Sequence, residues 1–170
     1  MKVGIISDTH DNLDAIGEAV VIFNDEGIEL LIHAGDFISP FTSQPFKKLK
    51  APLVGVFGNN DGDKLLLKKF YKSDGVGELY EDPYEFDFAD KKIIVTHKPQ
   101  IVEPLAASGR YDAVIFGHTH NVVIEQYSGR TEDREKTWVI NPGECCGYLT
   151  GRKTVALLDF AIDAAKPVTL

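Results

Sequence analysis

The stretch Leu31-Ile32-His33-Ala34-Gly35-Asp36 decides how the rest of this chain folds. It is an apolar run that ends at a small residue and then a carboxylate, and it is too short for a helix, so it predicts a buried strand. Two similar runs, at residues 3–7 and 53–58, are followed by Asp8 and by Asn59. Polar side chains are therefore expected at the same end of three successive strands, which is the edge of an open α/β sheet where ligands bind.

Strands and helices alternate in the first part of the chain. Apolar residues at helical spacing over residues 13–23 predict a helix that ends near Gly27, and a strand at residues 29–34 completes a βαβ unit with parallel strands. Short helices are expected at residues 41–49 and 65–70. From residue 84 the pattern changes to a hairpin of residues 84–88 and 92–96.

The second half is rich in strands. A helix is predicted over residues 101–108, and strands are predicted at residues 113–116, 122–127, 138–140 and 154–160. Residues 128–136 are expected to form a charged, solvated and mobile hairpin tip. The whole predicts a mixed α/β protein with two sheets, and the length of 170 residues fits one domain over residues 1–170.

Composition narrows the classes of function. The net charge of −8 and the pI of about 5.1 oppose loose binding to nucleic acid backbones or anionic lipid, so no stable nucleic acid complex and no membrane association are expected. The first apolar run is too short for a signal peptide, and no stretch approaches the ~20 apolar residues of a membrane span. We therefore predict a cytoplasmic protein.

The two cysteines, Cys145 and Cys146, are adjacent in the sequence. Neighbouring cysteines rarely meet the geometry of a relaxed disulfide, so reduced thiols are expected. The segment Gly-Glu-Cys-Cys-Gly lacks the spacing of zinc ligands, which favours buried structural thiols over metal ligands. The preceding segment Asn141-Pro142-Gly143 is either a simple turn or a turn that brings backbone groups near a site.

Candidate metal ligands recur directly after the predicted strands, and four of the five histidines stand there. Asp8 and His10 are two residues apart, as are His118 and His120, and in an extended backbone each such pair points to one side and converges. The set comprises two carboxylates, four imidazoles and one amide. Its members are Asp8, His10, Asp36, Asn59, His97, His118 and His120.

Oxygen and nitrogen ligands without a thiolate suit Mn, Fe, Ni, Co or Zn better than Ca. Seven ligands are too many for one such ion, so two divalent transition-metal ions are expected, with Asp36 as the carboxylate between them. The two ions bring four positive charges against two aspartates, which leaves a positive site for an anionic substrate. Two metals about 3.5–4 Å apart generate hydroxide near neutral pH and hold both oxygens of an in-line phosphoryl displacement.

Five blocks, in this order, resemble the calcineurin-like metallophosphoesterase superfamily. They are Asp8-x-His10, Gly35-Asp36, Gly58-Asn59-Asn60-Asp61, an isolated His97 and Gly117-His118-Thr119-His120. The short length and the late Asn141-Pro142-Gly143 are similar to the YfcE-type small prokaryotic phosphodiesterases. The resemblance implies an α/β fold, a four-layer αββα sandwich of two mixed β-sheets flanked by helices.

The resemblance also implies a division of the ligands between two ions. One ion is held by Asp8, His10, Asp36 and His120, and the other by Asp36, Asn59, His97 and His118. It further implies metal-dependent hydrolysis of a small phosphodiester through a bridging hydroxide. A phosphomonoesterase with the same centre and a non-catalytic scaffold of the retromer kind are the alternatives, and the scaffold is disfavoured because none of the seven ligand positions is replaced.

The sequence departs from this resemblance at Asn60, where most superfamily members have a histidine that is thought to contact phosphate and assist the leaving group. An amide has no proton to give at neutral pH, although it hydrogen-bonds phosphate oxygens. We therefore expect a preference for leaving groups that depart unaided, as in aryl phosphodiesters. Asp61, assigned with Asn60 to the catalytic set, is expected either to orient Asn60 or to cap the helix predicted at residue 65.

Two further expectations complete the picture. His33 lies inside an apolar run, so we interpret it as a core histidine, or one that hydrogen-bonds a ligand, rather than as a ligand itself. Exposed edges of the predicted sheets are compatible with a homodimer or a higher homo-oligomer.

Overall fold

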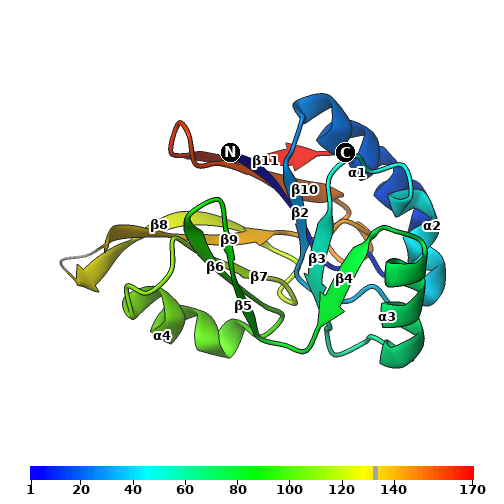
Figure 1. Ribbon diagram of the computed structural model, residues 1–170, viewed down its shortest axis with the longest axis horizontal. Coiled ribbons are helices and arrows are strands. Elements are labelled where there is room, and N and C mark those ends of the chain that lie inside the picture. Colours follow the sequence, from blue (N-terminus) through cyan, green and yellow to red (C-terminus); the bar gives the residue numbers. More distant parts are fainter. Residues whose placement is uncertain (132–133) are drawn as a thin grey trace.

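The computed structural model describes residues 1–131 and 134–170, which form two β-sheets and four α-helices (Figure 1). The charged tip predicted at residues 128–136 centres on residues 132–133, which lie outside the described residues. No helix in the described part of the chain is long and apolar enough to cross a membrane.

The first sheet has six strands in the order β11-β10-β1-β2-β3-β4. Their bounds are β1 Lys2–Ile6, β2 Leu30–His33, β3 Leu53–Val56, β4 Gly77–Tyr80, β10 Thr154–Asp159 and β11 Ala164–Thr169. Strands β1 to β4 are parallel, whereas β10 pairs antiparallel with β1 and β11 pairs antiparallel with β10. The carboxyl ends of four parallel strands therefore lie at the same end of this sheet.

The second sheet has five strands in the order β5-β6-β7-β9-β8. Their bounds are β5 Tyr84–Phe88, β6 Lys91–Thr96, β7 Ala113–Phe116, β8 Val122–Thr131 and β9 Arg134–Pro142. Strands β6, β7 and β9 are parallel, and the hairpins β5–β6 and β8–β9 are antiparallel. The β5–β6 turn consists of Ala89 and Asp90, whose φ angles of 47° and 64° fit the tight turns that match the twist of paired strands.

The helices are α1 Leu13–Glu26, α2 Ser43–Phe46, α3 Lys64–Ser73 and α4 Val102–Ala107, with 3-10 turns at Pro40–Thr42 and Pro99–Ile101. The Asn12 side chain caps the first turn of α1 by accepting from the Ala15 N–H. The helix ends at Gly27, as predicted, and this glycine adopts the left-handed conformation. The helix predicted over residues 41–49 is wrong in length. Pro45 lacks an N–H group and cannot continue a helical ladder from the preceding turn.

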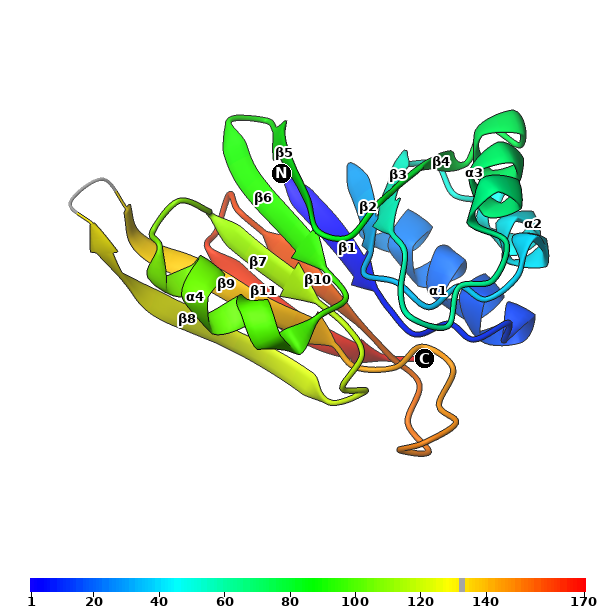
Figure 2. The ribbon, with the colours of Figure 1, turned by 90° about the horizontal axis from the view of Figure 1, so that it is seen from below.

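The two sheets lie face to face, with α1, α2 and α3 outside the first sheet and α4 outside the second (Figure 2). The alternation along β1 shows why: Val3 and Ile5 belong to the core between the sheets, whereas Ile6 belongs to the core under α1. A third core joins α4 to the second sheet through Val102, Ala106 and residues of β7. The predicted four-layer αββα sandwich of two mixed sheets is confirmed.

Candidate metal centre

The candidate ligands lie on loops at the carboxyl ends of parallel strands from both sheets. Asp8, Asp36 and Asn59 follow β1, β2 and β3 of the first sheet. His97 follows β6, and the segment 117–120 follows β7 of the second sheet. The sandwich therefore brings together the carboxyl ends of parallel strands from both sheets, which is where ligands bind in α/β proteins.

Hydrogen bonds join the loops of the two sheets. Within the first sheet, the Asp8 N–H donates to the Gly35 carbonyl at 3.0 Å. Between the sheets, the His118 N–H donates to Asp8 Oδ2 at 3.1 Å, and His97 Nδ1 lies 2.7 Å from the Ala34 carbonyl oxygen. These contacts fix the loops relative to one another.

The first group of candidate ligands surrounds the carboxylate of Asp8. Asp8 Oδ1 lies 3.7 Å from His10 Nε2 and 3.4 Å from His120 Nε2, and His10 Nε2 lies 3.5 Å from Asp36 Oδ2. The rings of His10 and His120 are stacked with their centroids 5.4 Å apart. Both aspartates are almost completely buried.

The second group lies on the other side of Asp36. His97 Nε2 is 3.4 Å from Asp36 Oδ2 and 3.0 Å from Asn59 Oδ1. The His118 ring meets the His97 ring edge-on at a centroid distance of 5.1 Å. Asp36 therefore stands between the two groups, within 3.5 Å of an imidazole nitrogen from each.

The backbone at the candidate ligands is not extended, as the argument from their two-residue spacing assumed. Five of them have left-handed φ angles, namely Asp8, His10, Asp36, His118 and His120. Asp8 and His10 still converge, but His118 contacts His97 whereas His120 contacts His10. Such backbone conformations cost of order 1–3 kcal/mol each in non-glycine residues and cluster at functional sites.

The donor set fits a cation. Among the residues that the structure describes, the buried side-chain polar atoms without a hydrogen-bond partner are Asp8 Oδ1 and His10 Nε2, which face each other. Nδ1 of His97 donates to the Ala34 carbonyl oxygen, so in the neutral ring Nε2 carries a lone pair. This lone pair faces oxygen atoms of Asp36 and Asn59. Lone pairs that face one another in a buried site are stabilised by a positive ion between them.

The carboxylates also perturb the histidines beside them. The Asp8 carboxylate, 3.7 Å from His10 Nε2, raises the pKa of His10. Burial lowers the pKa of His97, but the negative charge of Asp36, 3.4 Å from Nε2, outweighs burial and raises it. Burial likewise disfavours the ionised form of Asp36, yet His97 and the bonds from Asn60 hold the pKa of this carboxyl well below its usual range. The site is therefore strongly attractive to positive charge.

Asn60 and Asp61 follow Asn59 on the chain, and both bind the Asp36 loop. The Asn60 side chain donates to Asp36 Oδ2 at 2.8 Å, and its backbone N–H donates to Asp36 Oδ1 at 2.9 Å. The Asp61 carboxylate accepts backbone N–H bonds from Asp36, Gly58 and Ile38 at 3.2, 2.7 and 2.8 Å. Asp61 thus braces the loops that carry the candidate ligands.

The predicted alternative in which Asp61 caps the next helix is wrong. The cap of α3 is Asp63, whose side chain accepts from the Leu66 N–H at 2.9 Å. Burial raises the pKa of Asp61, and its carboxylate oxygens are directed at backbone groups. Its position therefore indicates a positioning role instead of contact with a reacting atom.

Two polar residues support the loop after β7: Glu144, which the sequence did not single out, and Asn141 of the Asn-Pro-Gly segment. Glu144 is completely buried and accepts from His120 Nδ1 at 2.7 Å, so the ring presents Nε2 to Asp8. Burial opposes ionisation of Glu144, but the Thr150 N–H and His120 lower its pKa to about 2. Asn141 donates to the Gly117 carbonyl at 3.1 Å, so the Asn-Pro-Gly turn organises this loop through a side chain.

His33 is a core histidine, as interpreted. It is completely buried and stacked on Phe37 with ring centroids 3.6 Å apart. Its ring nitrogens bond Thr9 Oγ1 and the Gly35 N–H, both at 3.2 Å. Burial lowers its pKa well below the usual value, so a neutral ring connects the loops that carry Asp8 and Asp36.

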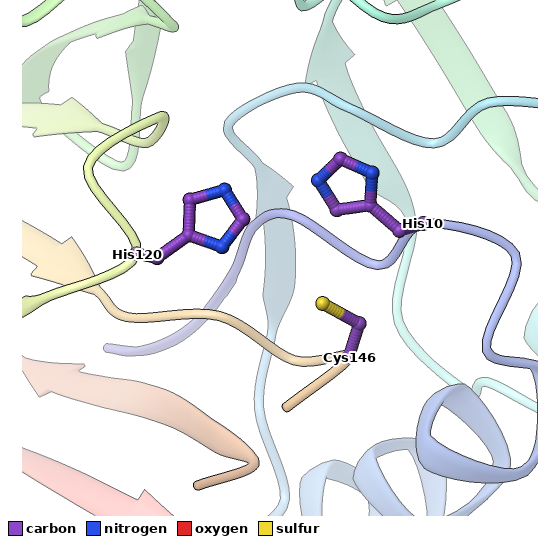
Figure 3. Close-up of side chains that lie close together, drawn as sticks. All are labelled: His10, His120 and Cys146. Atoms are coloured by element: carbon purple, nitrogen blue, oxygen red, sulfur yellow. The ribbon is translucent and has the colours of Figure 1, made fainter. Parts of the chain in front are cut away.

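Both cysteines are buried free thiols, as predicted. Cys145 belongs to the core under α1, but the Cys146 side chain points toward the rings of His10 and His120 (Figure 3). Ligand atoms of these three residues lie within 4.8 Å of one another. Cys146 Sγ also donates to Glu144 Oε2 at 3.3 Å.

Comparison with known proteins agrees with this geometry. Residues 1–163 match the family model of the calcineurin-like phosphoesterase superfamily domain. A phosphodiesterase of Methanocaldococcus jannaschii is 44% identical over 161 residues, which cover 94% of this chain and 93% of that protein. A solved archaeal phosphodiesterase is 42% identical with a TM-score of 0.88 over 100% of both chains. The phosphoesterase Yfce from E. coli shares the fold, with 19% identity and a TM-score of 0.70 over 99% and 98% of the two chains.

Proposed function

This chain belongs to the calcineurin-like phosphoesterase superfamily, and we propose that it is a phosphodiesterase that works through two divalent metal ions. Membership of the family makes it a hydrolase of phosphoric esters. The observation that carries the finer proposal is the position of Asp36, with Oδ2 at 3.5 Å from His10 Nε2 and 3.4 Å from His97 Nε2. A single carboxylate is thus within reach of both ligand groups.

In this proposal Asp8, His10 and His120 hold one ion, Asn59, His97 and His118 hold the other, and Asp36 is shared. When bound, a pair of ions such as manganese, nickel, iron, cobalt or zinc supplies a bridging hydroxide nucleophile near neutral pH and neutralises charge on the phosphoryl oxygens. His33, Asp61 and Glu144 orient the ligands, because each of them makes hydrogen bonds to a loop or side chain that belongs to the proposed centre.

The substrate is proposed to enter beside the second ligand group. A cavity of about 460 Å³ is lined there by Asn59, His97 and His118. Lys64 and Lys98 line the same cavity. Lys64 lies 3.6 Å from the carboxylate of Glu81, and Lys98 lies 3.3 Å from the carboxylate of Asp82. Because Glu81 and Asp82 line the same cavity and balance the two lysines, the attraction for an anionic phosphoester is proposed to come from the bound metal ions.

The proposal is tested by paired substrates. The full-length protein is stripped of metal with a chelator, reloaded with Mn²⁺, Ni²⁺, Co²⁺ or Zn²⁺ in turn, and assayed on bis-p-nitrophenyl phosphate and p-nitrophenyl phosphate. We expect metal-dependent turnover in which kcat/KM for the diester exceeds that for the monoester. A reversed ratio would identify a monoesterase with the same centre. Metal-loaded protein without activity on either ester would favour a scaffold role.

Asn60 is expected to restrict the leaving group, because its amide cannot protonate a departing alkoxide. We predict that the protein hydrolyses bis-p-nitrophenyl phosphate much faster than an alkyl diester such as glycerophosphocholine. Replacement Asn60→His should lower this aryl-to-alkyl ratio of kcat/KM at least about tenfold, since a positioned general acid contributes roughly 10²–10⁴-fold. The exchange Asn121→His, at an exposed position beyond His120, is the matched control. Equal rates on both esters in the unchanged protein would contradict the prediction.

A further inference from the structure

A sulfur atom lies beside the ligand group that contains His10 and His120. Ligand atoms of Cys146, His10 and His120 form a cluster within 4.8 Å, and the second such cluster in the described part of the chain, Asp8, Asp36 and His97, contains no sulfur. In Figure 3 the sulfur of Cys146 points toward the rings of His10 and His120 from one side of the pair. Cys146 therefore lies beside two of the histidines proposed to hold the first ion.

Backbone hydrogen bonds hold the sulfur in this place. The N–H of Cys146 donates to the Asp8 carbonyl at 3.1 Å, and the N–H of Cys145 donates to the Ser7 carbonyl at 3.0 Å. The Asn12 side chain donates to the Cys146 carbonyl at 2.9 Å. The cysteine loop is thereby fastened to the loop that carries Asp8 and His10.

Unpartnered atoms at the same point indicate a ligand. Asp8 Oδ1 is buried without a hydrogen-bond partner and lies 3.4 Å from His120 Nε2, and His10 Nε2 is the other such atom among the described residues. Thiolate is a soft ligand that favours zinc and cobalt over manganese and magnesium. A sulfur next to two imidazoles, on a loop that is bonded to the Asp8 backbone, suits such an ion.

We propose that Cys146 is an additional ligand of the ion held by Asp8, His10 and His120, which makes this position selective for thiophilic metals such as Zn²⁺ and Co²⁺. The inference rests on the proposed metal centre. On binding, a bond forms between sulfur and metal while the thiol proton, now directed at Glu144 Oε2, is lost to solvent. One proton is thus released from Cys146 for each ion bound at this position.

Cobalt reports on sulfur directly. The metal-free protein is titrated anaerobically with Co²⁺, and its visible and near-ultraviolet absorption is recorded. We expect a sulfur-to-cobalt charge-transfer band in the near ultraviolet that grows with the ion bound at this position. The band should be absent in Cys146→Ser, and the Kd for that Co²⁺ ion should weaken about 10-fold or more.

The serine variant separates ligation from hydrogen bonding, because a serine hydroxyl still donates to Glu144 but is a poor ligand. Cys145→Ser retains the neighbouring sulfur at Cys146 and should keep the band. Cys146→Ala serves if Cys146→Ser does not fold, as judged by circular dichroism. Visible cobalt bands without a Cys146-dependent ultraviolet band would overturn the inference and leave the metal centre intact. Failure to bind Co²⁺ at all would overturn both.

Discussion

Replacing Asp36 with alanine is expected to lower kcat/KM for bis-p-nitrophenyl phosphate at least about 1000-fold. Each factor of ten in rate corresponds to about 1.36 kcal/mol, so this loss corresponds to about 4 kcal/mol of transition-state stabilisation. Bound metal ions supply stabilisation of that size. Asp36 lies between the two ligand groups, so its removal takes an oxygen ligand from both proposed ions. The number of tightly bound ions per chain, measured by mass spectrometry after gel filtration, should fall from two to one or none.

The matched control is Asp11→Asn. Asp11 lies on the loop that also carries Asp8 and His10, but its carboxylate accepts from the N–H and Oγ of Ser39 at 3.1 and 2.7 Å. This variant should keep both ions and turn over the diester within about twofold of the unchanged protein. If Asp36→Ala kept two ions and at least a tenth of the activity, Asp36 would not be the shared ligand.

The central strands of the first sheet were predictable because each is a short apolar run that ends at a polar residue. The buried strands β1, β2 and β3 are the apolar runs. The polar residues that end these runs are the candidate ligands Asp8, Asp36 and Asn59. The strands that were not predicted, β4 and β11, are the two edges of the same sheet. An edge strand is covered on fewer sides, so its sequence is less constrained toward apolar residues.

Each of the missed strands shows this weakness. β4 has only four residues and begins with a glycine, and Leu79 is its only fully apolar side chain in the core. β11 is largely exposed and contains Pro167, which lacks the N–H that a central strand would need. Local pattern therefore sufficed for the buried strands and for the predicted edge strands β5 and β8, and it failed at the two edges of the first sheet.

The supporting residues of the site were hidden for a different reason. Glu144 and His120 are 24 residues apart, and their contact arises only because the loops after β7 and β9 lie side by side. The only local signal was that Glu144 follows a turn after a strand, which is the rule that located the candidate ligands. The ligand roles of those residues stay a prediction, although the fold places them together.

Gly58→Ala is expected to have the second large effect, because the glycine of the Gly-Asn-Asn-Asp block packs directly against Asp36. A Cβ atom at residue 58 would lie 2.5 Å from the Asp36 backbone nitrogen and closer still to Asp36 Oδ1. A side chain can rotate away from such a contact, but the backbone nitrogen of Asp36 cannot move unless the whole loop moves. We predict a loss of about 1–3 kcal/mol in the free energy of unfolding.

In Gly58→Ala, activity should fall more than stability. A shift of about 1 Å in the position of the reacting groups lowers the rate roughly 100-fold. Thermal denaturation and turnover of the diester, measured on the same metal-loaded preparation, separate the two effects. In Gly62→Ala the new Cβ would meet only the Ile38 carbonyl oxygen at 3.5 Å, an ordinary contact, so this control should behave like the unchanged protein. Full activity in Gly58→Ala would mean that the Asp36 loop moves freely, which would contradict the tight packing on which the proposed centre depends.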